Sequence, residues 1–234
     1  MLILGWDIGI KNLSYCLVEY TGNSNQPIED VYTNCKIKLW GIVDLLETDI
    51  SLPKNKQKKC KDLKLIEIGR TIKNKFDEIS AFNTVDYVVI ENQPVLKNPT
   101  MKSIQIMVFS YFLFKEQDPT LHTITDICLL NANNKMKVYK GDIDGDVLEK
   151  ITKLKSKYSQ NKKLAIVHTN LILDNLQESP VFIDMFNKSK KKDDYADSYL
   201  MTLFFISNRI NKPLKIKKTK PLKNKKTKPL SINN

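Results

Sequence analysis

The chain has 234 residues, 41% of them hydrophobic, so it can bury one sizeable core but is short for two full domains. Basic residues outnumber acidic ones by 12, yet nine lysines lie in residues 212 to 229, and without them the excess is only three. The sequence therefore predicts one mildly basic domain over residues 1 to 210. A basic tail over residues 211 to 234 follows, suited to binding polyanions without reading sequence.

The beginning of the chain and its cysteines bear on the cellular compartment. The first apolar run meets Gly5 and Asp7 too early for a signal peptide, and no apolar run approaches the roughly 20 residues of a membrane span. Four cysteines are present without a CxxC pair: Cys16, Cys35, Cys60 and Cys128. We therefore expect an intracellular protein of a reducing compartment, with no membrane association and no disulfide or zinc framework.

Five apolar runs predict strands: residues 2 to 8, 13 to 19, 37 to 43, 87 to 91 and 125 to 130. A short turn after Gly9 separates the first two, which predicts an antiparallel hairpin. Apolar residues at helical spacing predict four helices: residues 59 to 79, 101 to 114, 161 to 176 and 194 to 210. A hairpin followed by helical crossovers predicts an α/β fold with a mixed sheet covered by helices.

Two segments stand outside this pattern. Residues 141 to 157 form a polar insertion, which we expect to be a loop, and its GDIDGD cluster lacks the later ligands of a calcium-binding EF-hand. In the tail, KPLKIKKT at residue 212 and KPLKNKKT at residue 220 repeat with a period of eight. Prolines, like charges and few large apolar groups predict that this tail is disordered.

Four carboxylates lie where solubility alone would not place them. Asp7 follows LILGW within the first strand, and Glu91 ends the run VVI on the fourth. Asp194 and Asp197 are three residues apart at the start of a strongly apolar helix, so their side chains share the face that packs on the sheet. Buried charges are costly unless they are paired or bound to a metal.

If these four carboxylates converge, they form an all-oxygen site suited to Mg²⁺, with Mn²⁺ as a substitute. Two such ions could activate a water on one side of a phosphodiester and stabilise the leaving oxygen on the other. Each residue also has a structural interpretation: Asp7 as a turn cap, Glu91 as a lysine partner, and the two helical aspartates as helix-start acids. Two acids on apolar strands and two on one apolar helix together favour the catalytic interpretation.

The motifs around these acids resemble a known family. DIGIKN at residues 7 to 12, IENQP at residues 90 to 94 and DDYADS at residues 193 to 198 together resemble the poxvirus Holliday junction resolvases. More distantly they resemble bacterial RuvC and the mitochondrial cruciform-cutting enzymes of the RNase H-like superfamily. The likeness spans residues 1 to about 210, and the combination of motifs is far more selective than any one of them.

The resemblance implies an RNase H-like five-stranded mixed sheet, an antiparallel hairpin first and then parallel strands, with helices on both faces. It further implies a Mg²⁺-dependent homodimer that nicks four-way DNA junctions, with no small-molecule substrate. Carried over by position, Asp7, Glu91, Asp194 and Asp197 are the catalytic and metal-binding residues. Asp193 is an alternative to Asp194, which we prefer because the family pattern has the pair three apart.

Family members also place lysines near the cut phosphate, after the fifth strand and at the start of the next helix. Four lysines occupy comparable positions and are candidate DNA contacts: Lys135, Lys137, Lys162 and Lys163. For each of them a solvated basic rim is an equally good interpretation. The very apolar helix at residues 101 to 114 suits a dimer interface, although burial within one chain explains it almost as well.

Three functions remain open at this stage. The first is a resolvase in viral DNA replication or recombination, acting in the host cytoplasm or a virus factory, or in the nucleus if the basic tail serves nuclear import. The second is an RNase H-like nuclease with another substrate, an RNA/DNA hybrid or flapped DNA. The third is a non-catalytic DNA-binding module on the same fold, against which the intact carboxylate set argues.

Overall fold

In the computed structural model, the chain forms a five-stranded sheet with strand order β3-β2-β1-β4-β5. The structure describes residues 1–23, 28–48, 51, 53, 55–56, 59–60, 63–96, 98–118, 120–176 and 178–210, and the predicted tail lies outside them. Strands β1 to β3 pair antiparallel, whereas β4 and β5 run parallel to β1. The strands are β1 (Leu2–Asp7), β2 (Leu13–Tyr20), β3 (Cys35–Val43), β4 (Tyr87–Asn92) and β5 (Asp126–Asn131).

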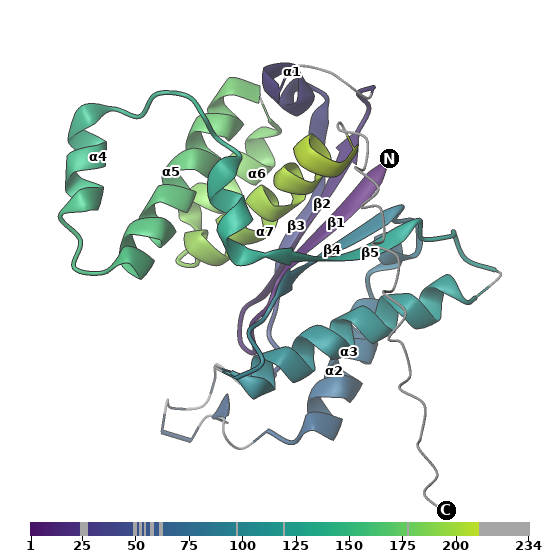
Figure 1. Cartoon of the computed structure of the whole chain (residues 1–234). Coiled ribbons are helices and arrows are strands. Elements are labelled where there is room, and N and C mark those ends of the chain that lie inside the picture. Colours follow the sequence, from purple (N-terminus) through teal and green to yellow (C-terminus); the bar gives the residue numbers. More distant parts are fainter. Residues whose placement is uncertain are drawn as a thin grey trace, which may run out of the picture.

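Helices cover both faces of this sheet, as predicted (Figure 1). Helices α2 and α3 lie on one face, and α5, α6 and α7 lie on the other, with α4 outside α5. None of the helices in the described part of the chain combines the length and apolarity needed to span a bilayer. The helices are α1 (Ile28–Thr33), α2 (Leu65–Asp77), α3 (Pro99–Glu116), α4 (Gly145–Thr152), α5 (Lys157–Leu176), α6 (Pro180–Lys188) and α7 (Lys192–Phe205).

Side chains alternate along β1, so successive residues lie on opposite faces of the sheet. Leu4 and Trp6 belong to the core beneath α2 and α3, where Trp6 stacks on Phe76 with ring centroids 4.6 Å apart. Ile3 belongs to the core beneath α7, and Gly5 lies directly against α7. Asp7 continues this second set and is therefore directed to the α7 side of the sheet.

The same alternation holds in β4. Val88 and Ile90 lie in the α2 and α3 core, whereas Val89 lies in the α7 core, so Glu91 follows on the α7 side. The parallel register pairs Trp6 with Ile90, which makes the next residue of each strand, Asp7 and Glu91, neighbours at one edge of the sheet. Strand pairing thus brings together two acids that are 84 positions apart in the sequence.

Helix α7 approaches the sheet closely because β1 has no side chain at Gly5. A Cβ atom there would lie 2.0 Å from Thr202 Oγ1 and 2.9 Å from the Ser198 carbonyl oxygen. Two hydrogen bonds then fix the first turn of the helix. Ser14 Oγ of β2 donates to the Asp194 carbonyl at 2.5 Å, and Trp40 Nε1 of β3 donates to the Tyr195 carbonyl at 3.0 Å.

The expectation of a loop at residues 141 to 157 is wrong, because this segment contains α4. The Asp144 carboxylate caps the helix by accepting from the Asp146 and Val147 amides at 3.0 and 3.1 Å. Ile151 is 4% exposed, and α4 packs on α5, so tertiary contacts stabilise a helix whose sequence is mostly polar.

Several boundaries also differ from the sequence prediction. Helix α2 begins at Leu65 rather than residue 59, and α5 begins at Lys157 rather than residue 161. Helix α7 ends at Phe205 and continues as a π-helical turn, Ile206–Ile210. The short helices α1 and α6 were not predicted, since six and nine residues give too few turns for a clear apolar period.

Candidate active site

The four predicted carboxylates line one cleft of about 490 Å³ at the edge of the sheet. Asp7 and Glu91 come from the carboxyl ends of the neighbouring parallel strands β1 and β4. Asp194 and Asp197 come from the first two turns of α7, the helix that packs on β1 and β2. The convergence expected from the sequence is therefore present in the fold.

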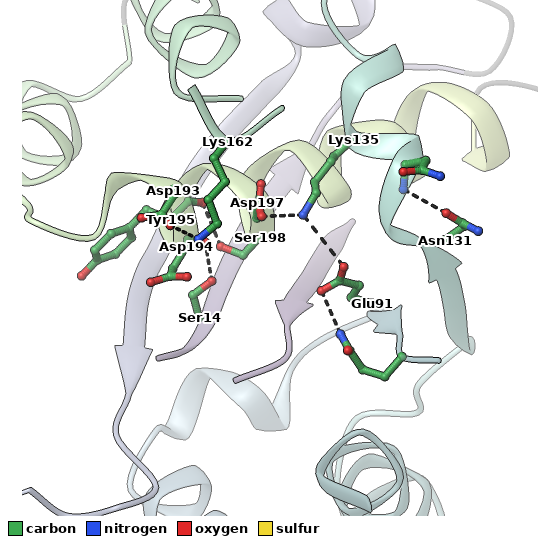
Figure 2. Close-up of polar contacts among 12 residues, drawn as sticks. Ser14, Glu91, Asn131, Lys135, Lys162, Asp193, Asp194, Tyr195, Asp197 and Ser198 are labelled. Carbon is green, nitrogen blue, oxygen red and sulfur yellow. Dashed lines mark hydrogen bonds and ion pairs between the residues drawn. The ribbon is translucent and has the colours of Figure 1, made fainter. Parts of the chain in front are cut away.

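Lys135 places a positive charge among these carboxylates. It lies in the 3₁₀ turn Ala132–Lys137, which directly follows β5, and its side chain is 14% exposed. Its Nζ is 2.5 Å from Asp197 Oδ2 and 3.9 Å from Glu91 Oε1, so the ammonium group lies between the two carboxylates (Figure 2). One of the four candidate lysines thus contacts the carboxylate quartet directly.

A single ammonium group does not balance the surrounding acids. Burial raises the pKa of Asp7 well above its usual range, and the charge of Glu91 raises it further. Burial also raises the pKa of Asp197, despite the opposing effect of Lys135. Burial disfavours the charge of Lys135, yet the attraction of Asp7, Asp197 and Glu91 outweighs it and raises the pKa of Lys135. The three carboxylates around Lys135 are therefore short of positive charge.

Asp194 lies in the same cleft, next to a second ion pair between an aspartate and a lysine. Burial and the charge of Asp193 raise the pKa of Asp194 to about 6, and its buried Oδ2 atom has no hydrogen-bond partner among the described residues. Asp193 instead forms an ion pair with Lys162, which lowers the pKa of Asp193 although burial opposes this. The geometry therefore favours Asp194 over Asp193 as the fourth residue of the quartet.

The candidate lysines divide into two groups. Lys135 and Lys162 line the carboxylate cleft. Lys137 is exposed and donates to Asn134 Oδ1 at 3.0 Å, and Lys163 lines a separate groove between α4 and α5. Of the four candidate lysines, the structure brings only Lys135 and Lys162 to the carboxylates.

Two glutamines, Gln93 in the cleft and the buried Gln105 behind it, support Glu91. The side-chain Nε2 of Gln93 donates to Glu91 Oε2 at 3.1 Å, and the backbone N–H of Gln93 donates to the side-chain oxygen of Gln105 at 2.7 Å. Gln105 is fully buried on α3. The IENQP motif already contained Gln93, whereas the contribution of Gln105 depends on tertiary packing that no local pattern reveals.

The donor set suits a hard divalent cation, because all four candidate ligands are carboxylates and three of them share one ammonium. The unpartnered Oδ2 of Asp194 adds a free oxygen in the same cleft. Among the described residues, no three Asp, Glu, His or Cys side chains are already grouped at metal-binding distances. Figure 2 shows that Lys135 lies between Glu91 and Asp197, so these two carboxylates do not contact each other.

The solved structures of two Holliday junction resolvases resemble this chain. The yeast mitochondrial Holliday junction resolvase Ydc2 aligns over 87% of this chain and 78% of its own, with a TM-score of 0.56 and 15% identity. The fowlpox virus resolvase, solved with its substrate Holliday junction DNA, aligns over 88% of this chain and 97% of its own, with a TM-score of 0.52 and 19% identity. The chain has the RNase H-like fold of these resolvases.

The sequence comparisons add a viral relative. An uncharacterized protein of Acanthamoeba polyphaga mimivirus is 38% identical over 144 residues, which are 59% of this chain and 34% of that protein. The chain thus spans about a third of the length of this curated relative. No protein-family model matches the chain.

Proposed function

We propose that this chain is a structure-selective endonuclease that hydrolyses phosphodiester bonds at four-way DNA junctions. The observation that carries the proposal is the meeting of Asp7, Glu91, Asp194 and Asp197 in one cleft, on a fold shared with two junction resolvases. The mimivirus and fowlpox similarities support a role in viral DNA replication or recombination. We accordingly expect the protein to act in the host cytoplasm or a virus factory.

In this mechanism the four carboxylates would hold divalent cations, Mg²⁺ by preference. Such ions would activate a water and stabilise the charge that develops on the phosphodiester. Gln93 orients Glu91 through its amide group, and the backbone contacts of α7 with β2 and β3 hold Asp194 and Asp197 in register with the strands. The chain thereby brings carboxylate oxygens from three separate elements into one cleft.

Lys135 and Lys162 bind the DNA backbone in this proposal. Both ammonium groups lie in the cleft, and both are paired with aspartates in the absence of substrate. A phosphate group entering the cleft would offer these ammonium groups a second acceptor, and release of Asp197 by Lys135 would make that carboxylate available to a cation. Phosphate contacts of this kind position the DNA without specifying its sequence.

The deciding experiment compares nucleic-acid substrates of one sequence. The purified chain is incubated with Mg²⁺ and a four-way junction, a duplex, a flap or an RNA/DNA hybrid, and the products are mapped at nucleotide resolution. Symmetric, religatable nicks confined to the junction are expected. Cleavage of the hybrid or the flap alone would assign the same cleft to another substrate, and binding without cleavage of any substrate would leave a DNA-binding module.

We also propose that the active form is a homodimer, since a four-way junction requires two matched cuts. The outer side of α3 carries apolar side chains that the chain itself leaves partly uncovered: Ile106 is 47% exposed and Phe114 is 72% exposed. An open groove between α2 and α3, about 640 Å³ in volume, adjoins both residues. Exposed apolar surface of this kind is typical of protein interfaces.

A further inference from the structure

The polar insertion is a folded part of the catalytic domain. Helix α4 is capped by Asp144, and its Val147 and Ile151 side chains line a groove with Val167 of α5. Ile151 is 4% exposed. Side chains carried by the end of α4 and by its turn into α5 are therefore held on a fixed support against the domain.

Positive charge is concentrated at this end of the insertion. Residues 150 to 163 contain six lysines and no acidic residue. Lys153 pairs with Glu149 at 2.5 Å and Lys162 pairs with Asp193, but the other four form no ion pair with any residue that the structure describes. Three of these four exposed residues, Lys150, Lys155 and Lys157, lie on α4, in its turn into α5 or at the start of α5, and are here called the insertion lysines.

Among the insertion lysines, Lys157 lies next to the carboxylate cleft. Helix α5 begins at Lys157, and its first two turns supply Tyr158, Asn161 and Lys162 to the lining of that cleft. Figure 1 shows α4 and its turn into α5 at the outer edge of the helical layer. Lysines therefore follow one another along the chain from Lys162 in the cleft, through Lys157, back to the insertion.

We propose that the insertion lysines bind backbone phosphates of a duplex arm that extends out of the cleft. This inference rests on the proposed function, because it requires DNA in the cleft. Duplex DNA carries one negative charge per about 1.7 Å of its axis, so an arm leaving the cleft presents phosphates to the adjacent surface. Lysine ammonium groups suit this role, since they bind phosphate as point charges and read no base.

The test uses two triple variants of the full chain with equal net charge. In the insertion variant, Lys150, Lys155 and Lys157 are replaced by glutamine. The control variant replaces Lys36 of β3, at the end of the sheet opposite the cleft, and Lys64 and Lys75 of the α2 region. Equilibrium binding to a four-way junction is measured over a salt series without divalent ions. The insertion variant is expected to bind about tenfold more weakly at 0.1 M salt, with a slope shallower by about 2 to 3, at roughly 0.9 per neutralised phosphate.

A second measurement does not depend on the variants. Amine-reactive labelling of the wild-type chain, followed by mass spectrometry, is expected to slow at the insertion lysines when junction DNA is bound and to stay unchanged at Lys36, Lys64 and Lys75. Equal weakening by both triple variants, or unslowed labelling of the insertion lysines, would overturn the inference. Failure of the wild-type chain to cut junctions would instead count against the proposed function, because the binding comparison does not involve cutting.

Discussion

At the scale of single residues, Asp7 separates catalysis from binding. It lies in the cleft among the carboxylates, whereas the ammonium groups that face the DNA belong to lysines. Asp7→Asn is therefore expected to abolish junction cutting and to leave junction affinity within about twofold of the wild type. Cleavage assays with Mg²⁺ and binding assays without it measure the two effects. An equal loss of both would contradict a catalytic role for Asp7.

The raised pKa of Asp194 predicts that the stability of the metal-free protein depends on pH. Its folded-state pKa, about 6, exceeds the ordinary value of 3.8, so the unfolded chain ionises first and the fold loses stability as the pH rises between these values. Asp194→Asn removes this cost and is expected to stabilise the protein at pH 7 by on the order of 1 kcal/mol, allowing for solvent screening. The gain should vanish near pH 4, as thermal unfolding with EDTA would show.

Asp193 provides the matched control for that experiment. Lys162 lowers the pKa of Asp193, so its charge stabilises the fold above the unfolded-state pKa and this contribution is lost on acidification. Asp193→Asn should therefore destabilise the protein at pH 7, opposite in sign to Asp194→Asn. The same sign in both variants would show that the two neighbouring carboxylates are not distinguished as described.

The sequence predicted the quartet because its acids stand in apolar segments, but it did not predict their electrostatics. The pattern of one acid at each strand end and two on one helix face sufficed for Asp7, Glu91, Asp194 and Asp197. The position of Lys135 between Glu91 and Asp197 depends on how the turn after β5 folds back over the sheet. Lys137, two residues along, has the same local signal and lies outside the cleft.

At the scale of elements, the contact between α7 and β1 leaves no room for a side chain at Gly5. Gly5→Ala would place a Cβ atom 2.9 Å from the Ser198 backbone oxygen and closer still to Thr202 Oγ1. We expect a loss of about 1 to 3 kcal/mol in unfolding free energy, with a larger fractional loss of cutting as α7 moves away from the strands. Denaturant unfolding and the junction cleavage rate measure these two effects.

Two further variants sharpen this test. Thr202→Ala in the Gly5→Ala background should restore only part of the stability, because the contact with the Ser198 backbone remains. Gly145→Ala is the control, since a Cβ atom at Gly145 of α4 would meet nothing within 4 Å. Full rescue by Thr202→Ala, or an equal loss from Gly145→Ala, would show that backbone crowding at Gly5 is not the cause.

The elements themselves were predictable where a period extends over enough residues. All five strands and the helices α2, α3, α5 and α7 follow apolar patterns of adequate length. Helix α4 was missed because Val147, Ile151 and few other apolar residues stand in a charged segment, and only the face of α5 gives them a partner. Burial against α5 thus overrode local polarity.

At the scale of the whole molecule, α3 is expected to determine the oligomeric state. Phe114→Asp would place a charge on the exposed apolar side of α3 without altering its buried face. The proposed dimer should then dissociate to monomers, with the melting temperature changed by only a few degrees. Light scattering after size exclusion measures this, and an unchanged mass would place the interface elsewhere or exclude a dimer on this surface.

The basic tail leads to a separate prediction, drawn from sequence alone. Removing residues 212 to 234 takes away nine lysines and no acid. Junction affinity should fall and its dependence on salt should flatten by roughly 0.9 for each phosphate that the tail no longer neutralises, while the cutting rate at saturating DNA stays the same. Unchanged affinity would indicate that the tail serves another purpose, such as nuclear import.

The register between β1 and β4 has a consequence for which changes in length the protein can tolerate. Inserting or deleting one residue within either strand would turn the acid of that strand to the other face of the sheet, toward the aromatic core of Trp6 and Phe76. Inserting or deleting two residues would keep the acid on the same face but shift it along the strand by about 7 Å. Residues added between β3 and α2, or before α4, leave this pairing untouched. Variation in chain length is therefore compatible with function in the connections and incompatible with it in the central strands.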